Sequence, residues 1–168
     1  MNNAERERLF EKLFAANQGR IQRICYGYLG PCGEVEDLFQ EIMVNVWNGL
    51  PNFRGESSPA TWLYRIAVNT ALIYRRKRRS TEPLPELADP ARGAQQTLEE
   101  RERLAALRSA VAGLPEQDRL VITLLLEGLS YKEIAEITGL TVNHVGVKIS
   151  RIKQVLEERL LEVHHGAV

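Results

Sequence analysis

The stretch that decides the fold lies in the second half of the chain and reads Ser130-Tyr131-Lys132-Glu133-Ile134-Ala135-Glu136-Ile137-Thr138-Gly139-Leu140-Thr141-Val142-Asn143-His144-Val145. Ser130 with Glu133 three residues later has the spacing of a capping box, in which each side chain bonds the other residue's backbone N–H. The pattern predicts a short helix over 130–137. Gly139 can adopt the left-handed conformation that the following turn needs, and Thr141 can cap a second helix. Together these signals predict a helix-turn-helix.

The second helix of this motif has one apolar side and one polar side. Apolar residues at helical spacing predict its buried face: Val142, Val145, Ile149, Ile152 and Leu156. The capped N-terminus of such a helix enters the DNA major groove, so we expect Thr141, Asn143 and His144 to contact bases there. Lys148, Arg151 and Lys153 lie further along and can reach phosphates. A helical hairpin that binds nothing is the alternative, but the capping box, turn glycine and polar N-terminus together favour DNA binding.

The remainder of the second half also has helical spacing, with a break before it. Leu104, Leu107 and Val111 form one apolar stripe, and another runs through a helix that ends near Gly128. Residues 80–97 contain three prolines and a glycine among polar neighbours, which excludes a continuous helix. We therefore expect a domain over 1–79, a flexible linker over 80–97 and a second domain over 98–168.

The first half predicts three helices. Ile21, Ile24, Cys25, Tyr28 and Leu29 share one face, and a longer apolar stripe runs from Val35 to Leu50, before Pro51. Pro59 suits the first position of a third helix, with Ser58 as its cap. That helix would place seven residues inward: Trp62, Leu63, Ile66, Ala67, Thr70, Ala71 and Tyr74. Because no alternating β pattern occurs, the predicted class is all-α: two small helical domains joined by a flexible linker, the second containing the helix-turn-helix.

Charge is distributed unevenly although the formal net charge is zero. Residues 1–79 contain 12 basic and 8 acidic side chains, whereas residues 98–168 contain 9 and 11. The basic excess is concentrated in Arg75-Arg76-Lys77-Arg78-Arg79. This run is equally typical of a polyanion-binding site and of a solvated helix end with favourable cations. Since phosphate neutralisation dominates DNA affinity, the acidic second domain should bind weakly by itself and benefit from being tethered.

Several function classes are excluded by what the sequence does not contain. No apolar run approaches the roughly 20 residues of a membrane span, and residues 1–10 are too polar for a secretory signal, so we expect a cytoplasmic protein without membrane insertion. Cys25 and Cys32 have no metal-ligand spacing, and the histidines are His144, His164 and His165. Neither a phosphate-binding loop nor a nucleophile elbow occurs. The sequence therefore predicts no enzyme, metal or cofactor.

Several motifs follow one another in an order that identifies a family. The second predicted helix contains Gly33-Glu34-Val35-Glu36-Asp37-Leu38-Phe39-Gln40-Glu41 and Val46-Trp47. After it comes Phe53-Arg54-Gly55-Glu56-Ser57-Ser58-Pro59-Ala60-Thr61-Trp62-Leu63-Tyr64-Arg65-Ile66-Ala67, then Asn69-Thr70-Ala71-Leu72. The second half adds Leu114-Pro115-Glu116-Gln117-Asp118-Arg119 and Gly128-Leu129-Ser130-Tyr131-Lys132-Glu133-Ile134-Ala135. Over about residues 8–162 the chain resembles the extracytoplasmic-function branch of the sigma-70 family.

The resemblance implies a sigma factor that directs core RNA polymerase to promoters and melts them. The first domain would bind the largest catalytic subunit through Glu34, Asp37, Gln40 and Glu41, a surface that on its residues alone is also typical of ordinary solvent exposure. It would open and bind the −10 element through Arg54, Ser57, Thr61, Arg65, Asn69, Arg75, Arg76, Lys77 and Arg78. The second domain would read the −35 element and contact the second-largest subunit. Members of this family are usually controlled by an anti-sigma factor, so the resemblance also implies such a partner.

Three other functions are alternatives to this interpretation. A regulator that binds DNA directly, such as a response-regulator output domain, shares the helix-turn-helix but predicts an N-terminal receiver domain, whose strand–helix alternation is absent from the sequence. The motifs of an enzyme are absent from the sequence. A protein-binding adaptor would not support promoter-specific transcription. The chain departs from the family at Gly146-Val147-Lys148, where a Lys-Ser-Arg-like run is frequent, and at Val68 and Ile73. Promoter preference therefore does not transfer from relatives.

Overall fold

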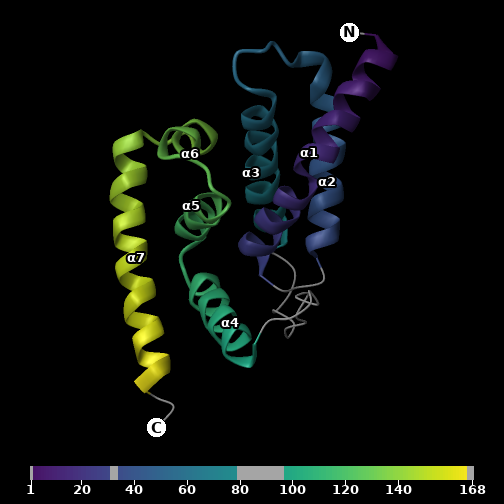
Figure 1. The fold of residues 1–168 in the computed structure, drawn as a ribbon. Coiled ribbons are helices and arrows are strands. Elements are labelled where there is room, and N and C mark those ends of the chain that lie inside the picture. Colours follow the sequence, from purple (N-terminus) through teal and green to yellow (C-terminus); the bar gives the residue numbers. More distant parts are fainter. Residues whose placement is uncertain (1, 31–33, 79–96, 166–168) are drawn as a thin grey trace.

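The computed structural model describes residues 2–30, 34–78 and 97–165, and these ranges contain α-helices and one 3₁₀ turn but no strand. Figure 1 shows two groups of helices side by side, with α1, α2 and α3 in one group and α4 to α7 in the other. The all-α class and the helix-turn-helix in the second half are confirmed. Of the predicted linker, residues 80–96 lie outside the described residues, and Thr97 is the N-cap of α4.

The first group has a long helix packed against a shorter pair. It consists of α1 (Asn3–Leu29), α2 (Val35–Gly49), the 3₁₀ turn η1 (Leu50–Asn52) and α3 (Pro59–Arg78). The α1 helix begins far upstream of the predicted face, because Asn2 and Glu5 form a capping box at its start. Ser58 caps α3 as expected, its hydroxyl accepting a bond from the Thr61 N–H at 3.0 Å.

The second group places α7 at its outer edge. It comprises α4 (Leu98–Ala112), α5 (Glu116–Leu126), α6 (Tyr131–Thr138) and α7 (Val142–His165). The α7 helix runs the full height of this group in Figure 1, with its N-terminus beside α6 and its C-terminus beyond α4. Its apolar stripe packs on α4, α5 and α6, so these helices fix its orientation.

The predicted cores are largely correct, with one clear exception on α7. Most of the predicted inward residues are buried, whereas Trp62, Ile66 and Leu29 are only partly buried against the core. Val142 was predicted to face inward, and that prediction is wrong because its side chain is 49% exposed. It lies in the first turn of α7, directly after the Thr141 cap, so the helical spacing counted it but the neighbouring helices do not cover it.

The two groups pack directly against each other. The α1 helix contacts α4 and α5, and α3 contacts α6. The backbones approach closely at Gly27 of α1, where a Cβ atom would lie 2.7 Å from Thr123 Cγ2 of α5. The described part of the chain is therefore closed, with α6 lying across α3.

Candidate nucleic-acid and polymerase interfaces

The α6–turn–α7 unit is built by local hydrogen bonds that the sequence specifies. Ser130 Oγ accepts a bond from the Glu133 N–H at 3.2 Å, and Glu133 Oε2 accepts one from the Ser130 N–H at 2.8 Å. The bonds that the Ser130 N–H and, at 2.7 Å, the Ser130 hydroxyl donate to the Glu133 carboxylate lower the pKa of Glu133. Gly139 has φ 75° and ψ 9°, the left-handed cap that ends α6. The capping box and the turn glycine are confirmed.

The N-terminal turn of α7 presents its predicted DNA-binding residues to solvent. Asn143 and His144 are exposed, as are Arg151 and Lys153 further along. Thr141 is exposed too, but its hydroxyl accepts a bond from the His144 N–H at 3.2 Å, so the side chain caps the helix.

One cation of this set already has a protein partner. Lys148 Nζ lies 2.6 Å from Asp118 Oδ1 of α5, and both side chains are partly covered. This ion pair offsets part of the positive charge that Lys148 would offer to a phosphate. It also connects α7 to α5, beside the helix face that carries Asn143 and His144.

Helix geometry shows which residues lie at the middle of the outward face of α7 and which lie at its sides. At about 100° per residue, Asn143, Val147 and Arg151 follow one line along the outside of α7. Relative to Val147, Lys148 lies about 100° to one side and Lys153 about 120° to the other. The two lysines therefore flank the outward face. Cations in these positions can contact the phosphate backbones on the two sides of a DNA groove.

Val147 is the residue of this face that the sequence analysis missed. Its side chain is 46% exposed, between the polar residues of the outward line. An exposed valine there can pack on a thymine methyl group. The signal was present in the sequence, because Val147 falls off the spacing of the buried stripe.

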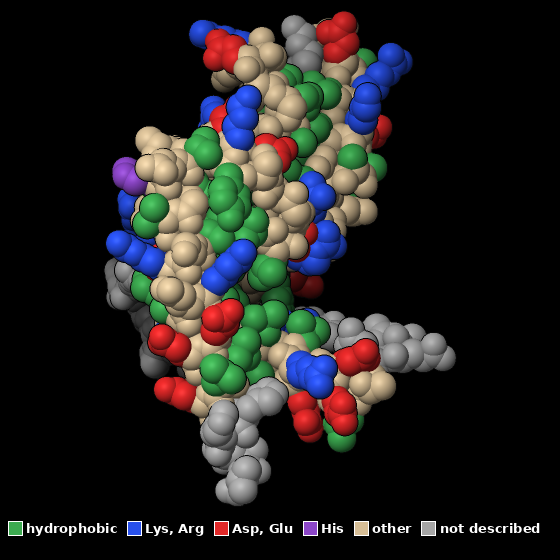
Figure 2. Space-filling model, turned by 60° about the vertical axis from the view of Figure 1, so that its left-hand side comes forward, with side chains coloured by type: hydrophobic (Ala, Val, Ile, Leu, Met, Phe, Trp, Pro, Cys, Tyr) green, Lys and Arg blue, Asp and Glu red, His purple; other side chains and the backbone are tan. Residues whose placement is uncertain are grey.

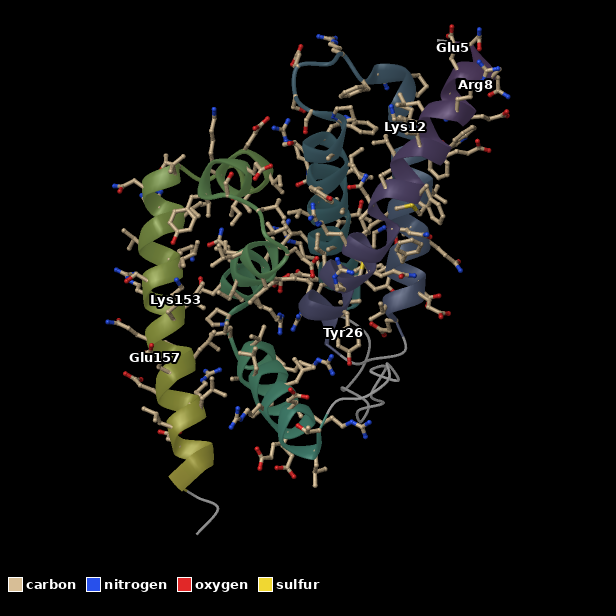
Figure 3. The ribbon with its side chains drawn as sticks, viewed as in Figure 1. Glu5, Arg8, Lys12, Tyr26, Lys153 and Glu157 are labelled. Atoms are coloured by element: carbon tan, nitrogen blue, oxygen red, sulfur yellow. The ribbon has the colours of Figure 1, made fainter. Side chains whose placement is uncertain are left out.

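The surface charge changes along the second group. Figure 2 shows blue basic side chains near the purple histidine on this face and red acidic side chains gathered toward the lower end. Figure 3 shows Lys153 and Glu157 one turn apart along the outer length of α7, where the helix changes from basic to acidic. Only the N-terminal part of α7 therefore has the charge that DNA phosphates require.

The predicted −10 residues lie along the 53–58 loop and α3, but they are not equally available. Arg54 and Asn69 are exposed, and Ser57 is partly buried. Thr61 is only 7% exposed, and its hydroxyl lies 2.7 Å from Ser58 Oγ, inside the α3 cap. Arg65 lies against α6, where Glu136 is its partner.

The cations of the basic run at the end of α3 differ in how far they are exposed. Arg75 donates a hydrogen bond to the Tyr28 carbonyl oxygen at 3.3 Å and lies over the Tyr28 ring. Arg76 and Lys77 are exposed. The side chain of Arg78 lies outside the described residues, as does all of Arg79.

The predicted polymerase-binding residues share the outward face of α2. Asp37 and Gln40 are exposed, while Glu34 and Glu41 are partly buried. Val44, three residues after Glu41 on the same face, is 56% exposed. The sequence analysis did not identify Val44, which adds an exposed apolar residue at the C-terminal end of an otherwise acidic and polar surface.

The described residues offer no metal site, no reactive cysteine and no membrane-spanning helix. Among the described residues, no group of three or more His, Cys, Asp or Glu side chains could hold a metal ion. Cys25 is fully buried in the first core, and burial raises the pKa of its thiol to about 12, which makes it unreactive. No helix in the described ranges is both long and apolar enough for a bilayer.

Comparisons with known proteins agree with this architecture. Residues 13–81 match the model of Sigma-70 region 2, and residues 104–156 match that of Sigma-70, region 4. The chain is 32% identical to the ECF RNA polymerase sigma-E factor of Escherichia coli K12, over 92% of this chain and 87% of the relative. The RNA polymerase sigma-H factor of Pseudomonas aeruginosa gives the same identity and the same coverage of each chain.

Solved structures that share the fold include RpoE and CnrH. The sigma factor RpoE of Bartonella quintana, solved in complex with the anti-sigma factor NepR, superposes with a TM-score of 0.75 at 21% identity, covering 90% of this chain and 96% of that one. CnrH, in complex with the cytosolic domain of CnrY, gives a TM-score of 0.69 at 26% identity, with 94% and 90% covered.

In the described residues, helices surround a capped helix-turn-helix, an architecture that is typical of DNA-binding transcription proteins. The two family matches and the curated relatives define it further: the chain belongs to the ECF group of the sigma-70 family of RNA polymerase sigma factors, which are transcription initiation factors. The resemblance inferred from its motifs is confirmed, and a regulator that acts without polymerase is not favoured.

Proposed function

We propose that the chain divides promoter recognition between its two helical groups. A region-2 domain over 1–79 binds core polymerase and opens the −10 element, and a region-4 domain over 98–168 reads the −35 element as duplex. The observation that carries this proposal is the position of Asn143 and His144, exposed at the capped N-terminus of α7. Such a turn places base-reading side chains in the major groove.

The polymerase-binding surface is the exposed line on α2. Asp37, Gln40 and Val44 succeed one another at intervals of three and four residues, so their side chains share one face. Acidic groups steer the encounter with a basic surface, and the exposed apolar residue at the end of this line supplies area to bury. We assign the largest catalytic subunit to this face and the second-largest subunit to the second domain, as in the family.

The −10 surface is the 53–58 loop together with the outward side of α3. Arg54, Arg65 and Asn69 provide donors for a displaced strand, and Arg76 and Lys77 continue the cationic path. Single-strand binding needs such a path together with base-contacting surfaces. Thr61 is the weakest member of the predicted set, since its hydroxyl is used in the Ser58 cap.

Regulation and location follow from the same assignment. RpoE was solved in complex with the anti-sigma factor NepR, which supports an anti-sigma factor as a partner of this chain. A factor that works on RNA polymerase acts in the cytoplasm, and we infer that this chain does so as a non-enzymatic subunit without cofactor.

Run-off transcription tests the proposal. Purified chain is mixed with core RNA polymerase and genomic DNA, and transcript start sites are mapped. We expect starts at a defined subset of promoters that core polymerase alone does not use. A start-site distribution identical to that of core alone would refute the proposal, and repression without polymerase binding would favour the direct regulator.

A further inference from the structure

The first turns of α1 contact the end of α2. Arg6 Nε and Nη2 donate hydrogen bonds to the Trp47 carbonyl oxygen at 3.1 and 2.5 Å, and the guanidinium carbon lies 4.1 Å from the centre of the Trp47 ring. Arg6 is partly buried, while the other residues from Asn3 to Arg8 are exposed. One cation of an otherwise solvent-exposed segment is therefore used in a contact between two helices.

This contact supplies a group that α2 lacks. The last carbonyl groups of a helix have no partner within it, and a cation near them is favourable. Trp47 lies in the last turn of α2, and this turn contains no basic residue of its own. Arg6 therefore caps the C-terminus of α2 from another helix.

Aromatic contacts hold the Trp47 ring from a second side. Phe10, one turn after Arg6, meets Trp47 edge-on with 5.4 Å between the ring centroids, and Phe10 stacks on Phe14 at 6.2 Å. Phe14 in turn lies 6.2 Å from the Phe39 ring of α2. The N-terminal half of α1 is thus in contact with α2 from Phe39 to its last turn.

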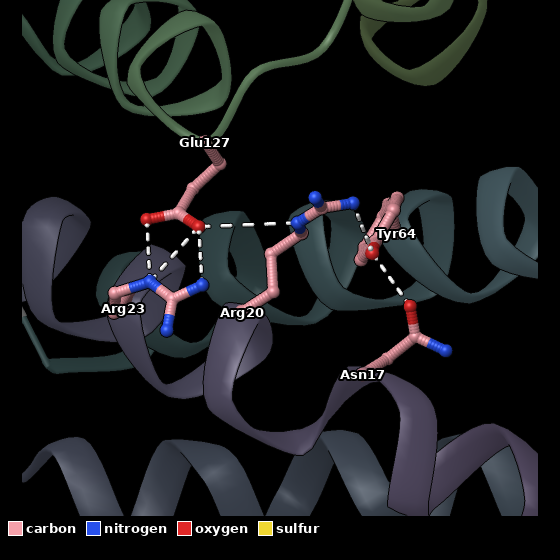
Figure 4. A network of polar contacts seen from close by, with 5 residues as sticks. All are labelled: Asn17, Arg20, Arg23, Tyr64 and Glu127. Atoms are coloured by element: carbon pink, nitrogen blue, oxygen red, sulfur yellow. Dashed lines mark hydrogen bonds and ion pairs between the residues drawn. The ribbon is translucent and has the colours of Figure 1, made fainter.

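The middle of α1 is held on α3. Figure 4 shows the Tyr64 hydroxyl, which donates to Asn17 Oδ1 at 2.6 Å and accepts a bond from Arg20 Nη1 at 3.1 Å. In the same view Arg23 donates to Glu127, just after α5, at 3.0 Å. Because these contacts fix α1 along its length, its first turns have a defined position next to α2.

The end of α2 determines where the 53–58 loop begins. A Cβ at Gly49 would lie 3.0 Å from Trp62 Cζ2, so the end of α2 lies directly on α3. The Phe53 N–H donates to the Leu50 carbonyl oxygen at 3.1 Å, and the Phe53 ring lies 5.1 Å from the Trp62 ring. Figure 1 shows this loop at the same end of the first group as the start of α1. A shift of the α2 end would therefore shift the start of the loop.

We propose that Arg6 is a positioning residue for the opening of the −10 element. By capping α2 and packing on Trp47, it holds the end of α2 and, through it, the start of the 53–58 loop in the position that receives the displaced strand. A surface that is already ordered binds at a lower cost than one that must be ordered first. Arg6 itself does not touch the strand. The proposal rests on the proposed role of the loop in −10 binding.

Three variants separate the contact from the charge. Arg6→Ala removes both hydrogen bonds and the ring contact, whereas Arg6→Lys keeps the charge but loses the paired donors of the guanidinium. Arg8→Ala is the matched control, because it makes the same charge change two residues further along α1. Arg8 is exposed and labelled in Figure 3, and at about 100° per residue it points to the opposite side of the helix from Arg6.

The first readout is amide hydrogen exchange of the free full-length chain, measured by mass spectrometry on peptides that cover residues 50–58. We expect exchange at least about fivefold faster in Arg6→Ala, intermediate in Arg6→Lys and unchanged in Arg8→Ala, because a loop can open separately from the core. Unchanged exchange in Arg6→Ala would overturn the positioning role. Equal acceleration in peptides from α7 would overturn it too, because that result would mean a general loss of stability.

The second readout is the rate at which holoenzyme becomes competent to transcribe a promoter mapped by run-off transcription. We expect this rate to fall at least about fivefold for Arg6→Ala on the duplex promoter, since a misplaced contact can cost up to about a hundredfold. On the same promoter with a premelted −10 region, Arg6→Ala should match the unaltered chain. Equal slowing on both templates, or on neither, would overturn the proposal. Circular dichroism melts identify an unfolded variant; if Arg6→Ala is unfolded, Arg6→Lys decides the result.

A chain that carries Arg54→Ala and Asn69→Ala separates this inference from the proposed function. If that chain opens the duplex promoter at the unaltered rate, the proposed role of the loop and α3 fails, while hydrogen exchange still decides whether Arg6 positions the loop. If that chain is slow and Arg6→Ala is not, the inference about Arg6 fails and the proposed function stands.

Discussion

The two helical groups present their functional residues in different ways. In α1 to α3 these residues are spread over a loop and the faces of two helices, in a segment with 12 basic and 8 acidic side chains. In the second group they are concentrated in the N-terminal part of α7, within a segment with 9 basic and 11 acidic side chains. This difference supports the proposal that the first group binds a flexible strand by charge, whereas the second depends on shape and on tethering to a complex already on DNA.

The largest expected effects come from the two cores. Ile42 of α2 and Ile149 of α7 are both essentially fully buried. Ile42→Ala and Ile149→Ala should each lower the free energy of unfolding by about 2–5 kcal/mol, from lost burial and the cavity left behind. Urea unfolding followed by circular dichroism measures this. A loss below about 1 kcal/mol at either site would mean that its core is not packed as described.

Promoter reading by α7 gives the next largest effect. Simultaneous Asn143→Ala and His144→Ala substitution removes the exposed base-reading side chains, and each good base contact contributes about 1–3 kcal/mol to discrimination. We expect holoenzyme to bind a promoter with its own −35 element at least tenfold more weakly. A promoter with a scrambled −35 element should show no further loss, and Glu157→Ala is the control on the same helix. Equal loss on both promoters would contradict −35 reading by these residues.

The polymerase-binding face of α2 should show a smaller change. Asp37→Lys reverses a charge at an exposed position, and we expect severalfold to about tenfold weaker binding of core polymerase, with most of the loss at low salt. Fluorescence anisotropy of labelled chain with core polymerase measures this, and Glu157→Lys is the matched control. Unchanged affinity for Asp37→Lys would remove Asp37 from the interface.

The smallest expected effect is the pH dependence of the α6 capping box. The folded pKa of Glu133 is lowered, so its stabilising effect is complete above its unfolded pKa of about 4.3 and disappears as the pH falls through the lower folded value. Glu133→Gln keeps the acceptor without the charge. The difference in Tm between the unaltered chain and this variant should therefore shrink between pH 6 and pH 3, and a constant difference would contradict the charged cap.

Local features of both groups could be predicted from the sequence because local residues determine them. Ser130, Glu133 and Gly139 specify the helix-turn-helix through bonds within a few residues, and Ser58 specifies the start of α3. The same periodicity was wrong for Val142, because burial at a helix end depends on neighbouring helices. It also missed the first half of α1, although the Asn2 capping box signals that start.

The relation between the groups could not be predicted. Arg23 and Glu127 are 104 residues apart, and nothing in local spacing pairs them. The same holds for Arg65 and Glu136, so a residue assigned to DNA was found against a second helix. Val44 and Val147 were missed for another reason. Helical spacing identifies the buried face of a helix and does not assign a role to apolar residues on the opposite face.

Run-off transcription on two templates tests the division of labour most directly. One template is a fully duplex promoter, and the other is the same promoter with its −10 region premelted by mismatches. If α3 opens DNA and α7 reads duplex, premelting should restore most of the transcription lost by Arg54→Ala together with Asn69→Ala, and little of that lost by Asn143→Ala with His144→Ala. Equal restoration of both variants by premelting, or of neither, would contradict the account.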